Sequence, residues 1–180
     1  MGQGTGSKII KQPPTILDIE ASGFGSNSFP IEIGVKRADG ARFCKLIKPY
    51  AHWRHWDDSA ARLHGITREQ LEEFGVDGKT VCLQLNAFLQ HSTAYSDGWV
   101  VDQPWLIKLF AESRIAMSFR LSALEYILSE KQMQCWHEVK KKLLAQQCVA
   151  RHRASVDAEL IQQTYIVSGS SGAVVCGLAR

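Results

Sequence analysis

The most informative stretch of this sequence is Ile16-Leu17-Asp18-Ile19-Glu20-Ala21-Ser22-Gly23-Phe24, an apolar, β-prone run that carries two acids and ends in a turn of small residues. Because side chains alternate along a strand, Asp18 and Glu20 lie on one face, roughly 6.6 Å apart along the backbone. Two like charges this close are unfavourable unless protons or a cation neutralise them, and a hard divalent metal with oxygen ligands is the usual solution. The alternative is a solvated strand end whose acids cap loops.

Strand signals continue beyond this run and then alternate with helical ones. Strands are predicted at 31–36 and 42–47, joined by the hairpin signal Asp39-Gly40, and again at 93–96 and 117–121. Capping residues and apolar spacing predict helices over six further segments. They are 57–64, 67–75, 79–90, a helix that Asp102 opens and that runs through 110, most of 122–149, and 153–165. This order predicts an α/β domain whose mixed sheet is covered by helices.

Length and composition are those of an ordinary globular protein. The chain has 180 residues, of which 45% are hydrophobic and 22% charged, which excludes a disordered or collagen-like chain. We expect one domain at 14–167, between a flexible N-terminal segment at 1–13 and a flexible tail at 168–180. No apolar run approaches the roughly 18–20 residues that cross a bilayer, and the N-terminus lacks the apolar middle of a secretion signal. The sequence therefore predicts a cytoplasmic protein without a membrane segment.

Bulk charge and cysteine spacing give no functional signal of their own. The net charge of +3 is too small to indicate a nucleic-acid binder, so any affinity for phosphate must be local. The five cysteines are scattered and never spaced as C-x-x-C, which indicates neither a disulfide framework nor a zinc knuckle.

Three further residues become informative only together. Asp102 stands before Gln103-Pro104, where an Asp ordinarily caps a helix. His152 and Asp157 are five residues apart, which on a helix separates them by about 140° and ~7.5 Å of rise. They therefore cannot stack on one helical face, but they can reach one bound object from different sides.

Five segments carry a resemblance to one family. They are the D-x-E strand and turn at 16–24, Pro30-Ile31-Glu32-Ile33-Gly34-Val35, Leu63-His64-Gly65-Ile66-Thr67, Val101-Asp102-Gln103-Pro104-Trp105-Leu106, and His152-Arg153-Ala154-Ser155-Val156-Asp157-Ala158. In this order they resemble the motifs of the DEDDh branch of the DnaQ-like 3′→5′ exonucleases. The resemblance covers about Thr15 to Tyr165 and implies an RNase H-like exonuclease fold, with a mixed five-stranded sheet of three antiparallel strands followed by parallel ones.

The sequence departs from the family pattern in two places. Many relatives have an H-N pair before the second-motif Asp, whereas Ser96-Asp97 stands there in this chain and makes Asp97 a rival to Asp102. We prefer Asp102, because Trp105 and Leu106 supply a helix anchor downstream and Asp97 before a glycine is typical of a turn. The third motif has Ser155-Val156 where relatives often have Leu and an acid, which leaves His152 and Asp157 in place.

The resemblance implies a metal-dependent 3′→5′ exonuclease that acts on single-stranded 3′ ends or short oligonucleotides and releases nucleoside 5′-monophosphates. Two Mg²⁺ or Mn²⁺ ions would be held by four acids, Asp18, Glu20, Asp102 and Asp157. His152 would take the proton from the attacking water. The terminal nucleotide would meet the backbone of Ala21, Ser22 and Gly23, the ring of Phe24, and His64.

Several points stay open at this stage. Phe24 is equally well explained as a core residue under its loop. Arg151 and Arg153 flank the proposed base and could contact phosphates, although arginines at a helix start usually meet only water. The sequence does not choose between DNA and RNA, and it does not decide whether the chain forms a homodimer. The competing interpretation is a non-catalytic module that binds nucleic-acid ends or a protein on the same scaffold; another is a metal-dependent endonuclease of a different fold.

Overall fold

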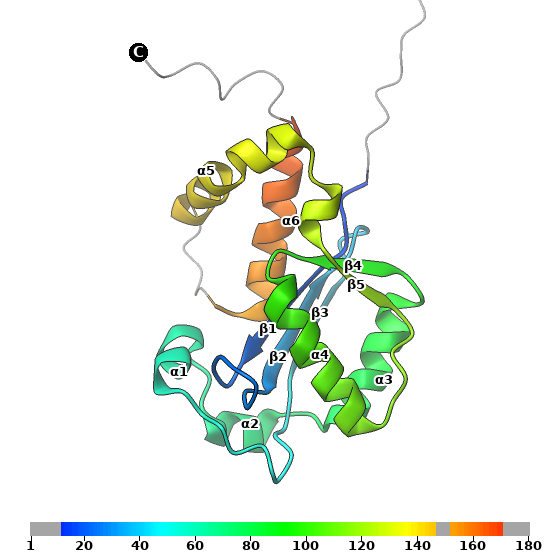
Figure 1. Ribbon diagram of the computed structural model, residues 1–180, viewed down its shortest axis with the longest axis vertical. Coiled ribbons are helices and arrows are strands. Elements are labelled where there is room, and N and C mark those ends of the chain that lie inside the picture. The colour runs from blue at the N-terminus through cyan, green and yellow to red at the C-terminus, as the bar shows by residue number, and fades with distance from the viewer. Residues whose placement is uncertain (1–11, 147–151, 171–180) are drawn as a thin grey trace, which may run out of the picture.

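The computed structural model describes residues 12–146 and 152–170, which form a five-stranded mixed sheet flanked by helices (Figure 1). The strands are β1 (Ile16–Ala21), β2 (Pro30–Lys36), β3 (Arg42–Leu46), β4 (Thr93–Ser96) and β5 (Arg120–Ala123). Their order across the sheet is β3-β2-β1-β4-β5. Strands β1, β2 and β3 pair antiparallel, whereas β4 pairs parallel with both β1 and β5. The predicted α/β class with a mixed five-stranded sheet is confirmed, and β5 begins three residues later than predicted.

The helices largely follow their sequence signals. They are α1 (Asp58–His64), α2 (Arg68–Phe74), α3 (Gly78–Leu89), α4 (Trp99–Ser113), the 3₁₀ turn η1 (Leu124–Ile127), α5 (Glu130–Gln146) and α6 (Ala154–Ser170). Asp57 caps α1 by accepting hydrogen bonds from the backbone of Ser59 (2.7 Å) and Ala60 (3.1 Å). Thr67 and Gln70 form the predicted capping box at the start of α2. In the described residues no helix is both long and apolar enough to span a membrane.

Helix α4 begins earlier than its sequence signals predicted. Asp102 was expected to open this helix, but the first helical residue is Trp99 and the N-cap is Gly98. Asp102 therefore lies one turn inside the helix, where its backbone N–H donates to the Gly98 carbonyl (3.0 Å). Its carboxylate is consequently not occupied in capping and is available for another role.

The alternation along β1 assigns its side chains to two different environments. Leu17 and Ile19 belong to the larger apolar core, together with residues of α3 and α4. Ile16 packs instead with Ala158 and Ile161 of α6. Because residues two apart share a face, Asp18 and Glu20 lie on the same face of the sheet as Ile16, under α6. The pairing of β1 with β2 is irregular between Glu20 and Ala21, which marks the point where the chain leaves the sheet.

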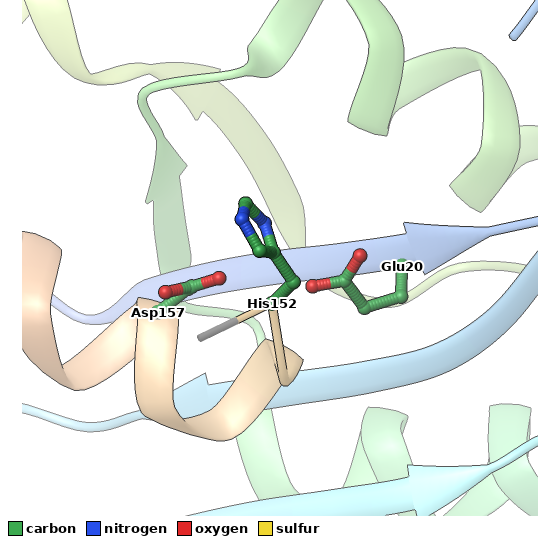
Figure 2. Close-up of side chains that lie close together, drawn as sticks. All are labelled: Glu20, His152 and Asp157. Atoms are coloured by element: carbon green, nitrogen blue, oxygen red, sulfur yellow. The ribbon is translucent and has the colours of Figure 1, made fainter. Parts of the chain in front are cut away.

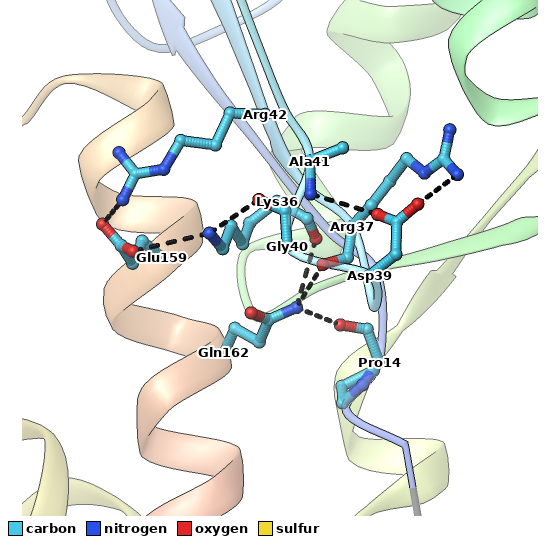
Figure 3. Close-up of polar contacts among 9 residues, drawn as sticks. All are labelled: Pro14, Lys36, Arg37, Asp39, Gly40, Ala41, Arg42, Glu159 and Gln162. Atoms are coloured by element: carbon cyan, nitrogen blue, oxygen red, sulfur yellow. Dashed lines mark hydrogen bonds and ion pairs between the residues drawn. The ribbon is translucent and has the colours of Figure 1, made fainter.

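Polar contacts hold α6 against the β2–β3 hairpin (Figure 3). The side-chain amide of Gln162 donates to the backbone carbonyls of Pro14 (2.8 Å), Arg37 (3.1 Å) and Lys36 (3.4 Å). Glu159 forms ion pairs with Lys36 and Arg42. These contacts fix α6 against the β2–β3 hairpin and against the residue Pro14 just before β1.

The predicted C-terminal boundary at 168 is wrong, because α6 continues through Ser170. Ser168 is buried, donates from its hydroxyl to the Tyr165 carbonyl (3.2 Å), and lies against Gln132 of α5. The small polar residues that resemble a linker in the sequence are thus the contact between two helices. The remaining predicted tail, 171–180, and positions 1–11 of the predicted N-terminal segment lie outside the described residues.

Candidate active site

A pocket of about 300 Å³ opens where the end of β1 meets α1, α4 and the start of α6. All of the predicted site residues except Ser22 line it. They are Asp18, Glu20, Ala21, Gly23, Phe24, His64, Asp102, His152 and Asp157. The exception, Ser22, is buried beneath the loop, where its hydroxyl accepts a hydrogen bond from the Phe29 N–H (3.1 Å). The fold therefore gathers distant segments of the sequence around one hollow.

Glu20, His152 and Asp157 form the tightest group of ligand atoms in this pocket (Figure 2). One ligand atom from each side chain lies within 4.8 Å of the other two. Figure 2 shows that Glu20 projects from β1, Asp157 from the first turn of α6, and His152 from the segment just before that helix. This separation lets a single metal ion contact all three side chains.

His152 has a backbone conformation that is uncommon among residues other than glycine. Its φ is +60°, in the left-handed region where side chains other than glycine are rare. Two residues later α6 begins, so this conformation turns the chain from the pocket wall into the helix. Residues held in this way are concentrated at functional sites in proteins generally.

The other two acids complete a dense concentration of negative charge. Burial raises the pKa of Asp18 well above its ordinary value, and the neighbouring charges of Asp102, Glu20 and Asp157 raise it further. Burial, followed by the charges of Asp157, Glu32 and Asp102, raises the pKa of Glu20 from 4.5 to about 7. Burial also raises the pKa of Asp102 to about 7, against the opposing effect of a hydrogen bond from Ser96. Without a cation, Asp18, Glu20 and Asp102 therefore hold their protons to higher pH than ordinary carboxyl groups do.

Asp102 and Asp97, the two candidates for the second-motif acid, have different contacts. The Ser96 hydroxyl orients Asp102. Asp102 is 2% exposed and accepts a hydrogen bond at Oδ2 from Ser96, whose own oxygen accepts one from the Gly98 N–H (2.9 Å). Asp97 forms an ion pair with Lys140 (2.5 Å) and does not line the pocket. It still acts on the site at a distance, because its charge raises the pKa of both Asp18 and Asp102.

The opposite side of the pocket is apolar and open to solvent. Phe24 is 70% exposed, so the interpretation of this residue as part of the core is wrong. Leu63 of α1 and Val101 of α4 also line the pocket and are 52% and 38% exposed. Neither was predicted to be a site residue: both were quoted only within motif segments, and Val101 was placed before the helix that Asp102 was expected to open. The available signal was position, since Leu63 directly precedes His64 and Val101 directly precedes Asp102.

His64 supplies a neutral ring to the pocket wall. It is 5% exposed, and its Nδ1 accepts a hydrogen bond from the Ile66 N–H (3.0 Å), which places the ring proton on Nε2. Burial lowers its pKa. Nε2 is buried and has no hydrogen-bond partner of normal geometry within the described residues, while the Ala21 backbone raises the pKa of the ring against the effect of burial.

Comparison with known proteins identifies the fold but not the family. No protein-family model and no curated protein sequence matches this chain. Among solved structures it is similar to E. coli Exonuclease I in complex with a dT13 oligonucleotide, with a TM-score of 0.68 at 12% identity over 89% of this chain and 41% of that one. The chain shares its fold with part of Exonuclease I.

Two further structures agree with this likeness. The zinc-bound form of an E. coli Exonuclease I complex with single-stranded DNA gives a TM-score of 0.64 at 11% identity, over 89% of this chain and 42% of that one. Exonuclease I from Methylocaldum szegediense gives 0.58 at 12% identity, over 87% and 39%. This chain thus spans about two-fifths of the length of these proteins. The likeness supports the predicted RNase H-like fold, while membership of the DEDDh branch stays a prediction.

The donor set of the pocket fits a hard divalent cation. Its donors are carboxylate oxygens with one imidazole, and none of the described residues that line it is a lysine or an arginine. The mutual repulsion that raises the pKa values of Asp18 and Glu20 is the interaction that a bound cation would reverse. The acids and His152 could therefore hold a metal, although their individual roles stay predictions.

Proposed function

We propose that this chain is a metal-dependent 3′→5′ exonuclease that acts on single-stranded DNA or RNA, or on short oligonucleotides, and releases nucleoside 5′-monophosphates. The observation that carries the proposal is one pocket in which acids and a histidine from β1, α4 and the start of α6 face an exposed apolar wall. The fold that this chain shares with part of Exonuclease I supports this function.

In the proposed site Asp18, Glu20, Asp102 and Asp157 would hold two Mg²⁺ or Mn²⁺ ions. When bound, such ions lower the pKa of a water ligand and neutralise charge on a phosphate oxygen. The Ser96 hydrogen bond commits one oxygen of Asp102 and leaves its other oxygen for a ligand. Binding would also release the protons that burial and repulsion retain on the acids, so metal affinity rises with pH.

His152 is the proposed general base. A neutral imidazole accepts a proton from water near pH 7, and His152 lies at the mouth of the pocket beside Glu20 and Asp157. The same position would also let it act as a metal ligand. The two roles differ in one measurable respect, since only a ligand is needed for metal binding.

We propose that the terminal nucleobase binds against the exposed apolar side of the pocket, which is formed by Phe24, Leu63 and Val101. Stacking on an aromatic ring contributes ~1–3 kcal/mol and tolerates any base, as an enzyme that removes successive nucleotides requires. Phe24 offers such a ring, which lies 6.4 Å from the Trp105 ring that supports it. A pocket of about 300 Å³ is at the small end for ligand sites, which suits one terminal nucleotide rather than a length of strand.

The decisive experiment is digestion of oligonucleotides that carry a label at one end. With Mn²⁺ or Mg²⁺, a 5′-labelled single strand should yield a ladder that shortens from the 3′ end, and a chelator should abolish it. A circular single strand of the same composition should survive, and its cleavage would indicate an endonuclease instead. Asp157→Asn is the matched inactive control. Binding of the 3′ end without any hydrolysis would favour the non-catalytic alternative.

A further inference from the structure

Glu32 is a fully buried acid that contacts the start of α6. It lies on β2, opposite Glu20 in the sheet, and has no solvent exposure. One carboxylate oxygen accepts a hydrogen bond from the Ala154 N–H (2.8 Å). The guanidinium of Arg153 donates to the same carboxylate from Nε (3.1 Å to each oxygen) and from Nη2 (2.6 Å). The contact thus joins β2 to the two residues that follow His152.

The sheet is shaped for this close approach. Gly34 lies two residues along from Glu32 on the same face, and a Cβ at that position would come within 2.1 Å of the Ala154 carbonyl carbon. No side chain fits there, so the first residue of α6 rests directly on the β2 backbone. His152 and Asp157 lie two residues before and three residues after Ala154, and their positions follow from this contact.

The ion pair between Glu32 and Arg153 also fixes the position of the Arg153 guanidinium, a positive charge near the acids of the pocket. Glu32 is paired with Glu20 across the sheet, so the Arg153 guanidinium that Glu32 binds lies beside an acid of the pocket. The Arg153 side chain is 42% exposed, whereas the side chain of its partner Glu32 has no solvent exposure. Bidentate hydrogen bonding to a buried carboxylate fixes both the position and the orientation of a guanidinium group.

We propose that Glu32 is a positioning residue for the acidic pocket: it holds the Arg153 guanidinium on β2, so that this cation does not neutralise Glu20 and Asp157 and their charge is left for a divalent metal. The inference rests on the proposed metal site. It assigns Arg153 to Glu32 rather than to a substrate phosphate. It also explains why a carboxylate is buried at this point of β2, where an apolar residue would serve the core better.

Mn²⁺ affinity, measured by calorimetry on the folded full-length chain at about pH 8, tests this inference without any substrate. Glu32→Gln keeps the size of the side chain but releases the arginine. We expect it to weaken Mn²⁺ binding about ten- to hundredfold, the range typical of partners that orient metal ligands. In Glu32→Gln/Arg153→Gln the released cation is absent, and the affinity should return to within a fewfold of the wild-type value. A purely structural role would lower the melting temperature of both variants and would not give this recovery.

A second pair of variants addresses the same claim if Glu32→Gln does not fold. Arg153→Lys keeps the positive charge but loses the bidentate grip, and it should bind Mn²⁺ more weakly than the wild type. Arg153→Gln removes the charge and should bind at least as tightly as the wild type. Unchanged affinity in Glu32→Gln, or no recovery in the double variant, would overturn the role of Glu32 while leaving the metal site intact. Absence of Mn²⁺ binding by the wild-type chain would overturn the metal site and this inference with it.

Discussion

Replacing Glu20 by glutamine is expected to stabilise the metal-free chain at alkaline pH, although it removes a proposed metal ligand. The pKa of Glu20 is raised from 4.5 to about 7, chiefly by burial and then by the charge of Asp157. The folded chain therefore holds this proton more tightly than the unfolded chain does. Below about pH 4.5 both states are protonated and Glu20 does not affect the free energy of unfolding. As the pH rises from there to about 7, the unfolded chain loses its proton first and stability falls.

The size of this effect follows from the two pKa values. At about 1.4 kcal/mol for each pKa unit, the rise from 4.5 to about 7 corresponds to a loss of about 3 kcal/mol above pH 7. Glutamine has no proton to lose and avoids the penalty. The Glu20→Gln chain should therefore gain about 3 kcal/mol over the wild type at about pH 8, and under about 1 kcal/mol at about pH 5.

Urea unfolding in the presence of a chelator, followed by tryptophan fluorescence, measures this difference at the two pH values. Glu73→Gln is the matched control, because Glu73 is an exposed acid on α2 and its replacement should change little at either pH. Added Mn²⁺ should reverse the order at about pH 8, since only the wild type keeps all of its ligands. Equal stability of wild type and Glu20→Gln at alkaline pH would refute the conclusion that burial and the neighbouring acids make the charge of Glu20 unfavourable.

Two further predictions concern the reaction. His152→Ala should lower the turnover rate about 10²–10⁴-fold, the contribution typical of a general base, while calorimetry shows unchanged Mn²⁺ affinity; loss of Mn²⁺ binding would make His152 a metal ligand instead. Phe24→Ala should raise KM about tenfold or more with a similar maximal rate, because a stacked base contributes ~1–3 kcal/mol, and the melting temperature should not change since the ring is 70% exposed. A fall in stability without any change in KM would contradict that role of Phe24.

The parts of the molecule that the sequence predicted are those in which local chemistry decides the structure. The alternation of Ile16, Asp18 and Glu20 with Leu17 and Ile19 required both acids to share one face, and the apolar clusters of the fold follow that division. The same holds for the capping box at Thr67, where two side chains and two backbone groups within four residues satisfy one another.

The parts that were missed depend on contacts between distant segments. The sequence around Ser168 has the composition of a flexible linker. The residue is buried only because α5 packs against it through Gln132. The start of α4 was placed at Asp102, because Gly98, its true N-cap, makes no side-chain capping bond that a sequence pattern would reveal. Glu32 gave no signal of its own either, since its partners Arg153 and Ala154 lie more than a hundred residues away.

The two faces of the sheet differ in how they hold their helices, and this difference bears on the site. Helices α3 and α4 pack through the larger apolar core, which is tolerant of small rotations because apolar contacts have little directionality. Helix α6 packs through a smaller apolar cluster and is fixed in addition by Gln162, by Glu159 and by the Glu32 contact at its first turn. Hydrogen bonds and ion pairs fix both the position and the rotation of a helix. A functional site needs both to be fixed, because its side chains must be held to within about half an ångström of the working geometry. Because Asp18 and Glu20 share their face of the sheet with Ile16, the polar attachment of α6 beside that apolar contact is the arrangement that lets Asp157 and His152 reach the two acids.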